Sequence, residues 1–393
     1  MSAELLATAA VPSAGRSTRS LREILTLPHL PALDGLRAAA VLTVIVGHAN
    51  YPVRGVPSDL GVSAFFVLSG FLITRLLIAE HDATASISLF RFYLRRTLRI
   101  FPAYYAFLLL SLVLDSVQGQ RWTPALLGSA LTYSVNYFNA FHHHPPTSIA
   151  HAWSLAVEEQ FYLLWPIAFL LLRARGRRMV AVGVVITAVV VATWRSWLAL
   201  GAEVDTSYLY NAFDTRFDNL AVGCLLAVLL EHEGFIAVAE ASAKRVWSPL
   251  IPLALMISSR TLLPEAYHYS VGFTVDAILA AIIMLQLVQL SSRWMWSWLD
   301  HLVLRFIGVI SYPMYLYHAW GASVGRHVMT TEGGRFWTGL AATIALACGS
   351  YFIIERPLLA LRHQLGASAK RARVTPSSHV PTALRRTQGL PLT

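Results

Sequence analysis

Long apolar runs separated by short, arginine-rich polar loops fill the chain from residue 33 onward. A helix needs about 20 predominantly apolar residues to cross a bilayer, and these runs are near that length. Ten spans are predicted, over residues 33–50, 61–79, 100–115, 155–172, 179–199, 217–231, 247–263, 271–290, 302–322 and 336–354. The pattern predicts an all-α, polytopic membrane helix bundle.

A further apolar stretch, residues 123–141, has two interpretations. If it crosses the membrane, the arginine-rich loop 173–178 falls outside, against the positive-inside rule. If it is re-entrant or lies at the interface, the inner segments hold 21 Lys and Arg residues and the outer loops hold four. Those four are Arg54, Arg121, Arg326 and Arg335. The asymmetry favours a re-entrant segment with both termini in the cytoplasm.

Composition supports a membrane protein. Hydrophobic residues make up 56% of the 393 residues and charged residues only 13%, about half the share of roughly 25% found in soluble domains. So few charges cannot cover the surface of a soluble enzyme. The net charge of +10 comes mostly from short loops and the termini, so membrane lipid is the expected partner and nucleic acid is not.

Three regions are expected. Residues 1–32 are predicted to be a cytoplasmic N-terminal segment, and residues 33–358 one membrane-embedded domain. Residues 359–393 are predicted to be a disordered, basic cytoplasmic tail. The tail either contacts anionic lipid or only sets the topology.

The first span carries Asp34, Arg37 and His48. Eleven residues separate Arg37 from His48, close to three helical turns, so both share a face about 16 Å apart along the axis. Asp34 is placed to pair with Arg37 at i,i+3. Ionisable groups are costly within a membrane, which favours a functional face over snorkelling or interfacial side chains.

Three arginines, Arg95, Arg96 and Arg99, precede the third span and share a helical face. Guanidinium forks bind phosphate through charge-assisted, bidentate hydrogen bonds. Basic cytoplasmic loops are common, so the alternative is that these residues only fix the topology.

The outer entry of the span 155–172 carries His151, Ser154, Glu158 and Glu159. Neighbouring helical residues differ by about 100°, so only one carboxylate can face a given partner. Glu158 shares a face with Tyr162. We expect one carboxylate to orient or charge-balance His48, the alternative being an acid pair that faces water.

Further candidates lie later in the chain. Arg216 and Asp218 begin one span, and Tyr315 and His318 can line one face with Ser311. The alternatives are an interfacial ion pair and an aromatic belt. The run His142–His144 has no second ligand cluster of matching spacing, so no metal site is predicted. Ser69, in a Leu-Ser-Gly run, is expected to serve helix packing rather than catalysis.

In this order, the motifs resemble those of the family 3 membrane acyltransferases, bacterial enzymes that acylate cell-surface glycans and some secondary metabolites. The resemblance covers residues 33 to about 358. Its motifs are LDGLR at 33–37 with His48, GVSAFFVLSGFLI at 61–73, YLRRTLRIFP at 93–102, HAWSL at 151–155 with EEQFY at 158–162, RFD at 216–218, SYPMYLYH at 311–318 and ERP at 355–357.

The resemblance implies an acyl-CoA donor on the cytoplasmic side, typically acetyl-CoA, and no permanently bound cofactor. It implies a glycan or secondary-metabolite acceptor, reached directly or through a separate acyltransferase on the outer side, and a bacterial cytoplasmic membrane location. Arg37, His48, Arg96 and Arg99 match key positions, with Glu158 or Glu159 beside them. In this hypothesis, Arg95, Arg96 and Arg99 hold the CoA phosphates. His48 acts as a general base or carries the acyl group.

A transporter or flippase for a polar lipid or glycan is the alternative, because it would use the same buried charges as a translocation path. The sequence shows no inverted repeat and no matched pair of broken helices, which favours the enzyme.

Overall fold

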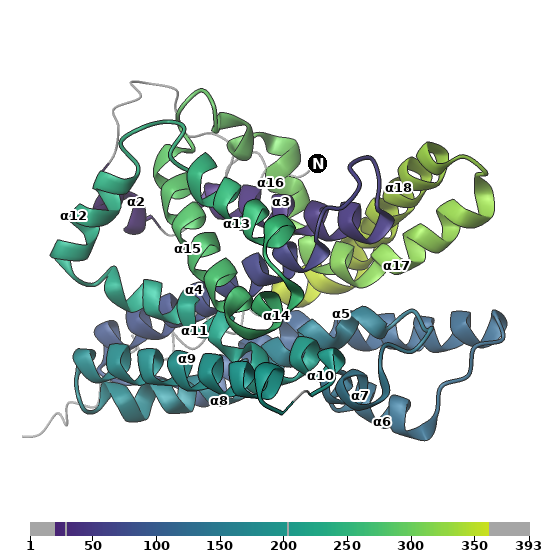
Figure 1. Cartoon of the computed structure of the whole chain (residues 1–393), viewed down its shortest axis with the longest axis horizontal. Coiled ribbons are helices and arrows are strands. Elements are labelled where there is room, and N and C mark those ends of the chain that lie inside the picture. Colours follow the sequence, from purple (N-terminus) through teal and green to yellow (C-terminus); the bar gives the residue numbers. More distant parts are fainter. Residues whose placement is uncertain (1–19, 28–29, 203, 361–393) are drawn as a thin grey trace, which may run out of the picture.

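The structure is a computed structural model that describes residues 20–27, 30–202 and 204–360. Helices joined by short loops make up this part of the chain, and no strand occurs within it (Figure 1). The predicted all-α class is confirmed.

Seven helical segments of the described chain are long and apolar enough to cross a membrane. An eighth candidate pairs Thr206–Leu229 with α12 (Glu233–Ser242) across a bend of 111°. The helices in these segments are α3 (Pro31–Ala49), α4 (Ser58–Thr84), α5 (Leu89–Val117), α8 (Trp153–Arg173) after the turn η1 (Ala150–Ala152), α9 (Arg177–Leu200), α10 (Thr206–Asn211), α11 (Phe213–Leu229), α14 (Glu265–Tyr267), η2 (His268–Gly272), α15 (Phe273–Leu290), α18 (Glu332–Ser350) and η4 (Tyr351–Glu355).

Two of the ten predicted spans differ from expectation. The span at 247–263 is α13 (Leu250–Leu262), whose 13 residues reach only about 20 Å. The span at 302–322 is divided at Ile310 into α16 (Leu302–Val309) and α17 (Ser311–Val328). The short η3 turn (Ser297–Asp300) precedes α16. Apolarity alone did not reveal these lengths and this break.

Residues 123–141 form two short helices, α6 (Pro124–Leu131) and α7 (Val135–His142), instead of one span. Asp115, near the end of α5, accepts hydrogen bonds from the backbone nitrogen and the hydroxyl of Ser148, both at 3.1 Å. Ser148 lies just before α8. The start of α8 is therefore close to the end of α5, at the same end of the bundle. Residues 123–141 form no single helix long enough to cross a membrane, and their re-entrant or interfacial placement stays a prediction.

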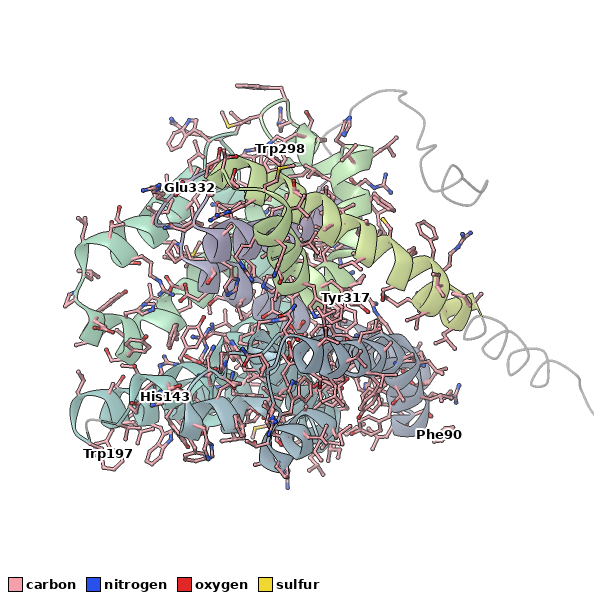
Figure 2. All side chains as sticks on the ribbon, turned by 90° about the vertical axis from the view of Figure 1, so that its right-hand side faces the viewer. Phe90, His143, Trp197, Trp298, Tyr317 and Glu332 are labelled. Atoms are coloured by element: carbon pink, nitrogen blue, oxygen red, sulfur yellow. The ribbon has the colours of Figure 1, made fainter. Side chains whose placement is uncertain are left out.

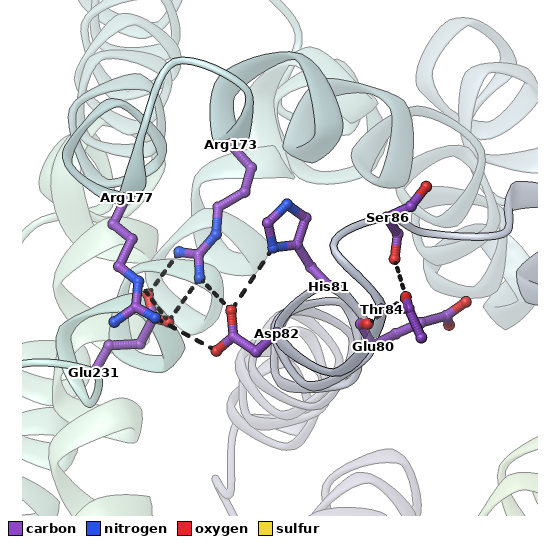
Figure 3. Close-up of polar contacts among 8 residues, drawn as sticks. All are labelled: Glu80, His81, Asp82, Thr84, Ser86, Arg173, Arg177 and Glu231. Carbon is purple, nitrogen blue, oxygen red and sulfur yellow. Dashed lines mark hydrogen bonds and ion pairs between the residues drawn. The ribbon is translucent and has the colours of Figure 1, made fainter.

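The polar ends of four helices meet in one ion-pair network (Figure 3). Arg173, at the end of α8, pairs with Asp82 of α4 at 2.8 Å and with Glu231, beyond α11, at 2.9 Å. Arg177, at the start of α9, lies 3.6 and 3.8 Å from the same two carboxylates. These ends therefore lie on one side of the membrane. The positive-inside rule assigns that side to the cytoplasm.

Glycines let α4 and α11 pack closely. A Cβ atom on Gly70 would lie 2.0 Å from the carbonyl oxygen of Leu220, and one on Gly223 would lie 2.1 Å from that of Val67. Only a residue without a side chain fits there. The packing role predicted for this part of α4 is confirmed at Gly70.

Exposed apolar side chains surround the bundle. Phe90, Trp197 and Trp298 project at its edges in Figure 2, and α8 and α9 lie side by side along the lower edge in Figure 1. Lipid is the medium that makes so apolar a surface stable.

The described part of the N-terminal segment packs onto the bundle. The short helix α2 (Leu21–Leu25) begins with a capping box between Ser20 and Glu23. The backbone nitrogen of Leu21 donates to Glu240 of α12 at 2.9 Å. Residues 1–19 and the tail from residue 361 lie outside the described residues, so the predicted three-region division remains a prediction.

Candidate functional site

Two polar cavities lie at opposite ends of α3. The first, here called the basic cavity, has about 700 Å³ of empty space including its mouth. The second, here called the histidine cavity, has about 1100 Å³ measured in the same way. Arg37 lines the basic cavity and His48 the histidine cavity. The two residues predicted to share a face of one helix thus serve two different spaces.

Three arginines make the basic cavity cationic. Arg37 comes from α3, and Arg96 and Arg99 come from α5. The guanidinium of Arg96 lies 5.0 Å from the ring centre of Tyr162, a distance at which cation–π attraction fixes its position. A compact group of guanidinium ions is suited to phosphate.

Arg95 lies apart from this group. Its Nη2 pairs with Oε2 of Glu80 at 3.0 Å. The other oxygen of Glu80 accepts from the backbone nitrogen of Ser88, also at 3.0 Å. The structure therefore separates Arg95 from the two arginines with which it was predicted to act.

A carboxylate faces the arginines across the basic cavity. Ser69 donates to Oε1 of Glu158 at 3.0 Å, and Tyr162 donates to Oε2 at 3.2 Å. The predicted shared face of Glu158 and Tyr162 is confirmed. Glu159 also lines the cavity. Ser69, assigned only to packing by its sequence, instead holds a candidate catalytic carboxylate.

His48 has a defined tautomer. Its Nδ1 lies 3.0 Å from the carbonyl oxygen of Val44. A carbonyl can only accept, so Nδ1 carries the proton and Nε2 keeps its lone pair. A backbone carbonyl occupies the orienting role that was expected of Glu158 or Glu159, which line the other cavity.

His318 and His151 continue the polar cluster inward from His48. The ring centre of His318 lies 5.0 Å from that of His48 and 4.5 Å from that of His151. Nδ1 of His318 contacts the carbonyl oxygen of Tyr315 at 2.7 Å, which leaves Nε2 of His318 as an acceptor. Two histidines with free Nε2 lone pairs therefore line the histidine cavity.

Side chains of α17 separate the two cavities. Tyr315 lines the basic cavity and His318 the histidine cavity, with ring centres 5.5 Å apart. Tyr315 donates to the carbonyl oxygen of His151 at 3.1 Å, and its oxygen lies 2.6 Å from Oγ of Ser154. We call this layer, formed by Tyr315 and His318, the partition.

Besides Arg95 and His151, three more predicted candidates lie outside both cavities. Asp218 pairs with Arg195 at 2.9 Å, and both side chains are fully buried. Arg216 is buried against aromatic rings, 3.7 Å from the ring centre of Phe273. Asp218 therefore pairs with Arg195 and not with Arg216, and a functional role for Arg216 or Asp218 stays a prediction. The backbone of Asp34 lies where α3 closely approaches Gly308 of α16.

Other cavity residues gave weak sequence signals. Arg54, Arg326 and Arg335 line the histidine cavity. They looked like scattered outer arginines because Arg54 is far along the chain from the other two, which lie on different helices. His144 bonds Asn211 through Nε2 at 3.0 Å, and burial lowers the pKa of this histidine. No group of three His, Cys, Asp or Glu in the described chain is placed to hold a metal.

Comparison with known proteins gives consistent matches. The acyltransferase domain family matches residues 30–355. The peptidoglycan O-acetyltransferase OatA of Listeria monocytogenes is 30% identical over 366 residues, which cover 87% of this chain and 57% of that protein. O-acetyltransferase OatA of Staphylococcus aureus is 32% identical over 332 residues, 76% of this chain and 52% of that protein.

A putative O-acetyltransferase of Staphylococcus aureus, SAR0937, is 30% identical over 94% of this chain and 62% of its own length. The chain thus spans somewhat more than half the length of these relatives. No solved structure matches it. The family match covers most of the chain and all of the helices that line the two cavities, and on that ground the chain belongs to the acyltransferase domain family, acyltransferase family 3.

Proposed function

We propose that the protein is a membrane O-acyltransferase that moves an acetyl group from acetyl-CoA to a hydroxyl of an envelope glycan. The observation that carries this proposal is the pair of cavities, one cationic and one with two free imidazole nitrogens, which end at a common partition. This arrangement suits a donor and an acceptor held on opposite sides of a membrane. The bacterial relatives favour the cytoplasmic membrane as its location.

The basic cavity is the proposed donor site. Arg96 and Arg99 bind the phosphates of CoA near its mouth, and Arg37 extends the cationic lining along α3. The thioester end then reaches the partition. Glu158, held by Ser69 and Tyr162, balances the arginine charge and keeps the cavity lining ordered when no donor is bound.

His48 is the proposed general base. Its Nε2 takes the proton of the acceptor hydroxyl while the hydroxyl oxygen attacks the thioester carbonyl carbon. The carbon–sulfur bond breaks, an ester forms, and the proton passes to the leaving CoA thiolate. Transient acylation of His48 at Nε2 is the alternative route, with the same reactants and products.

The acceptor class rests on the relatives. One relative is named for peptidoglycan O-acetylation, which favours a polysaccharide of the envelope over a secondary metabolite. Transfer proceeds either directly to the glycan or through a separate acyltransferase on the outer side.

Thiol release from acetyl-CoA tests the proposal. Purified protein in lipid vesicles is supplied with acetyl-CoA, with and without peptidoglycan fragments, and free CoA thiol is measured. We expect fragment-dependent release that falls about 10²–10⁴-fold in His48→Ala, the usual contribution of a general base. His143→Ala is the matched control because His143 lines neither cavity.

A transporter or flippase would release no thiol with any acceptor. Equal rates for wild type and His48→Ala would remove His48 from the chemistry.

A further inference from the structure

Few arginines lie on the predicted outer side, and most of these line a single cavity. Of the four outer residues Arg54, Arg121, Arg326 and Arg335, all but Arg121 line the histidine cavity. Arg54 comes from the loop after α3, Arg326 from the end of α17, and Arg335 from the start of α18. Topology does not explain this gathering, because the positive-inside rule disfavours arginine on this side.

The charges around the cavity do not cancel. Glu332 lines it as well and pairs with Arg54 at 3.0 Å; Glu332 is labelled at the upper left in Figure 2. Within the described chain, Arg326 and Arg335 have no carboxylate within ion-pair distance. Arg335 uses only its Nε, which donates to the carbonyl oxygen of Met329 at 3.1 Å. Two guanidinium groups therefore remain available for an anion.

The wall of the cavity also offers an aromatic surface. The rings of Tyr51 and Phe336, both lining the cavity, have centres 5.4 Å apart. Aromatic rings bury apolar area and have defined packing geometry, which suits the C–H face of a sugar. His48 and His318 line the same cavity, so a sugar held there would lie beside two imidazoles.

We propose that the histidine cavity binds an anionic saccharide, with Arg326 and Arg335 holding its carboxylate or phosphate and a hydroxyl directed to Nε2 of His48. This inference rests on the proposed acyl transfer for the role of the hydroxyl, but the anion binding itself does not require turnover. Guanidinium pairs bind carboxylate and phosphate by the same bidentate geometry. The exposed Arg54–Glu332 pair links the loop after α3 to the start of α18.

Equilibrium binding without acetyl-CoA tests the inference. The full chain in lipid nanodiscs is titrated with two matched pairs of probes by calorimetry. One pair is the hyaluronan tetrasaccharide and its carboxyl-reduced form. The other is chitotetraose 6-phosphate and chitotetraose. We expect the anionic member of at least one pair to bind at least tenfold more tightly, and the carboxylate and phosphate arms identify the group that is recognised.

Three variants assign the binding to the arginines. Arg326→Gln and Arg335→Gln should each weaken anionic binding about fivefold, as expected for charge pairs near solvent, and leave neutral binding unchanged. Arg326→Lys keeps the charge but loses the bidentate fork, so its affinity for the anionic probe should fall between those of wild type and Arg326→Gln. Arg121→Gln, the outer arginine away from the cavity, is the matched control and should bind like wild type.

Equal binding, or no binding, of anionic and neutral probes by wild type would overturn the inference. Equal losses in Arg121→Gln and Arg326→Gln would also overturn it, because a general surface charge would then be responsible. If the protein releases thiol normally but shows one of these two binding results, anionic recognition is disproved and the proposed acyl transfer is not. If the protein binds the anionic probe but never releases thiol, the proposed acyl transfer is disproved and anionic recognition is not.

Discussion

Neighbouring arginines on α5 have different partners. Arg95 pairs with Glu80, whereas Arg96 and Arg99 line the basic cavity. Donor binding should therefore depend on the second pair only. Arg96→Ala and Arg99→Ala should each raise the KM for acetyl-CoA about tenfold through loss of a charge-assisted phosphate contact.

Initial rates at varied acetyl-CoA measure this effect, with Arg95→Ala as the adjacent control that should keep its donor KM. An equal rise in all three variants would indicate a shared effect of loop charge instead of a cavity contact.

Glu158 is held by two hydroxyl groups. Ser69→Ala or Tyr162→Phe removes one donor and leaves the carboxylate in place. We expect each variant to lower kcat/KM for acetyl-CoA about threefold to tenfold, with little change in expression, since one hydrogen bond to a charged group contributes about 1.5–3 kcal/mol at most. Glu158→Gln should lower kcat/KM further. If Ser69→Ala matches wild type while Glu158→Gln is inactive, the carboxylate does not need this hydroxyl for its position.

At the scale of helices, the contact of α4 with α11 depends on glycine. Gly223→Ala places a Cβ atom about 2 Å from a backbone oxygen of α4, and such overpacking usually costs about 1–3 kcal/mol. The thermal midpoint of the detergent-solubilised protein should fall. Gly349→Ala is the control, because nothing lies within 4 Å of the added atom; its midpoint should stay level or rise. Equal midpoints in the two variants would show that α4 and α11 can separate without loss of stability.

At the scale of the molecule, the fold predicts which residues face each side of the membrane. Gln118 and His143 flank the α6–α7 pair, and Ser86 precedes α5. In intact cells, single cysteines at positions 118 and 143 should react with a membrane-impermeant maleimide, and one at 86 only after permeabilisation. The parent protein, with Cys224 and Cys348, sets the background. If the cysteine at position 118 is labelled and the one at position 143 is not, the α6–α7 pair crosses the membrane.

The sequence predicted the features that depend on hydrophobic periodicity and on the distribution of charge along the chain. The alternation of apolar runs with polar loops predicted the helical class. The excess of arginine on the predicted inner side indicated that residues 123–141 do not cross the membrane. Spacing placed Arg37 and His48 on one helix and Glu158 beside Tyr162.

Features that depend on tertiary packing could not be predicted. The pairing of Arg95 with Glu80 and the meeting of Arg54 with Arg326 and Arg335 join different segments, and nothing in the local pattern of any one segment reveals them. The break at Ile310 had a local signal, because Pro313 follows it and proline cannot donate the helical hydrogen bond.

The partition has an electrical consequence. Water-filled spaces on both sides would concentrate the membrane voltage across the layer of Tyr315 and His318. Moving one elementary charge through 100 mV involves about 2.3 kcal/mol of work. The acetyl group carries no charge, but the proton that His48 returns to the CoA thiolate must cross this layer, so the voltage acts on the proton and not on the acetyl group. The charged phosphates of the donor need never enter the field.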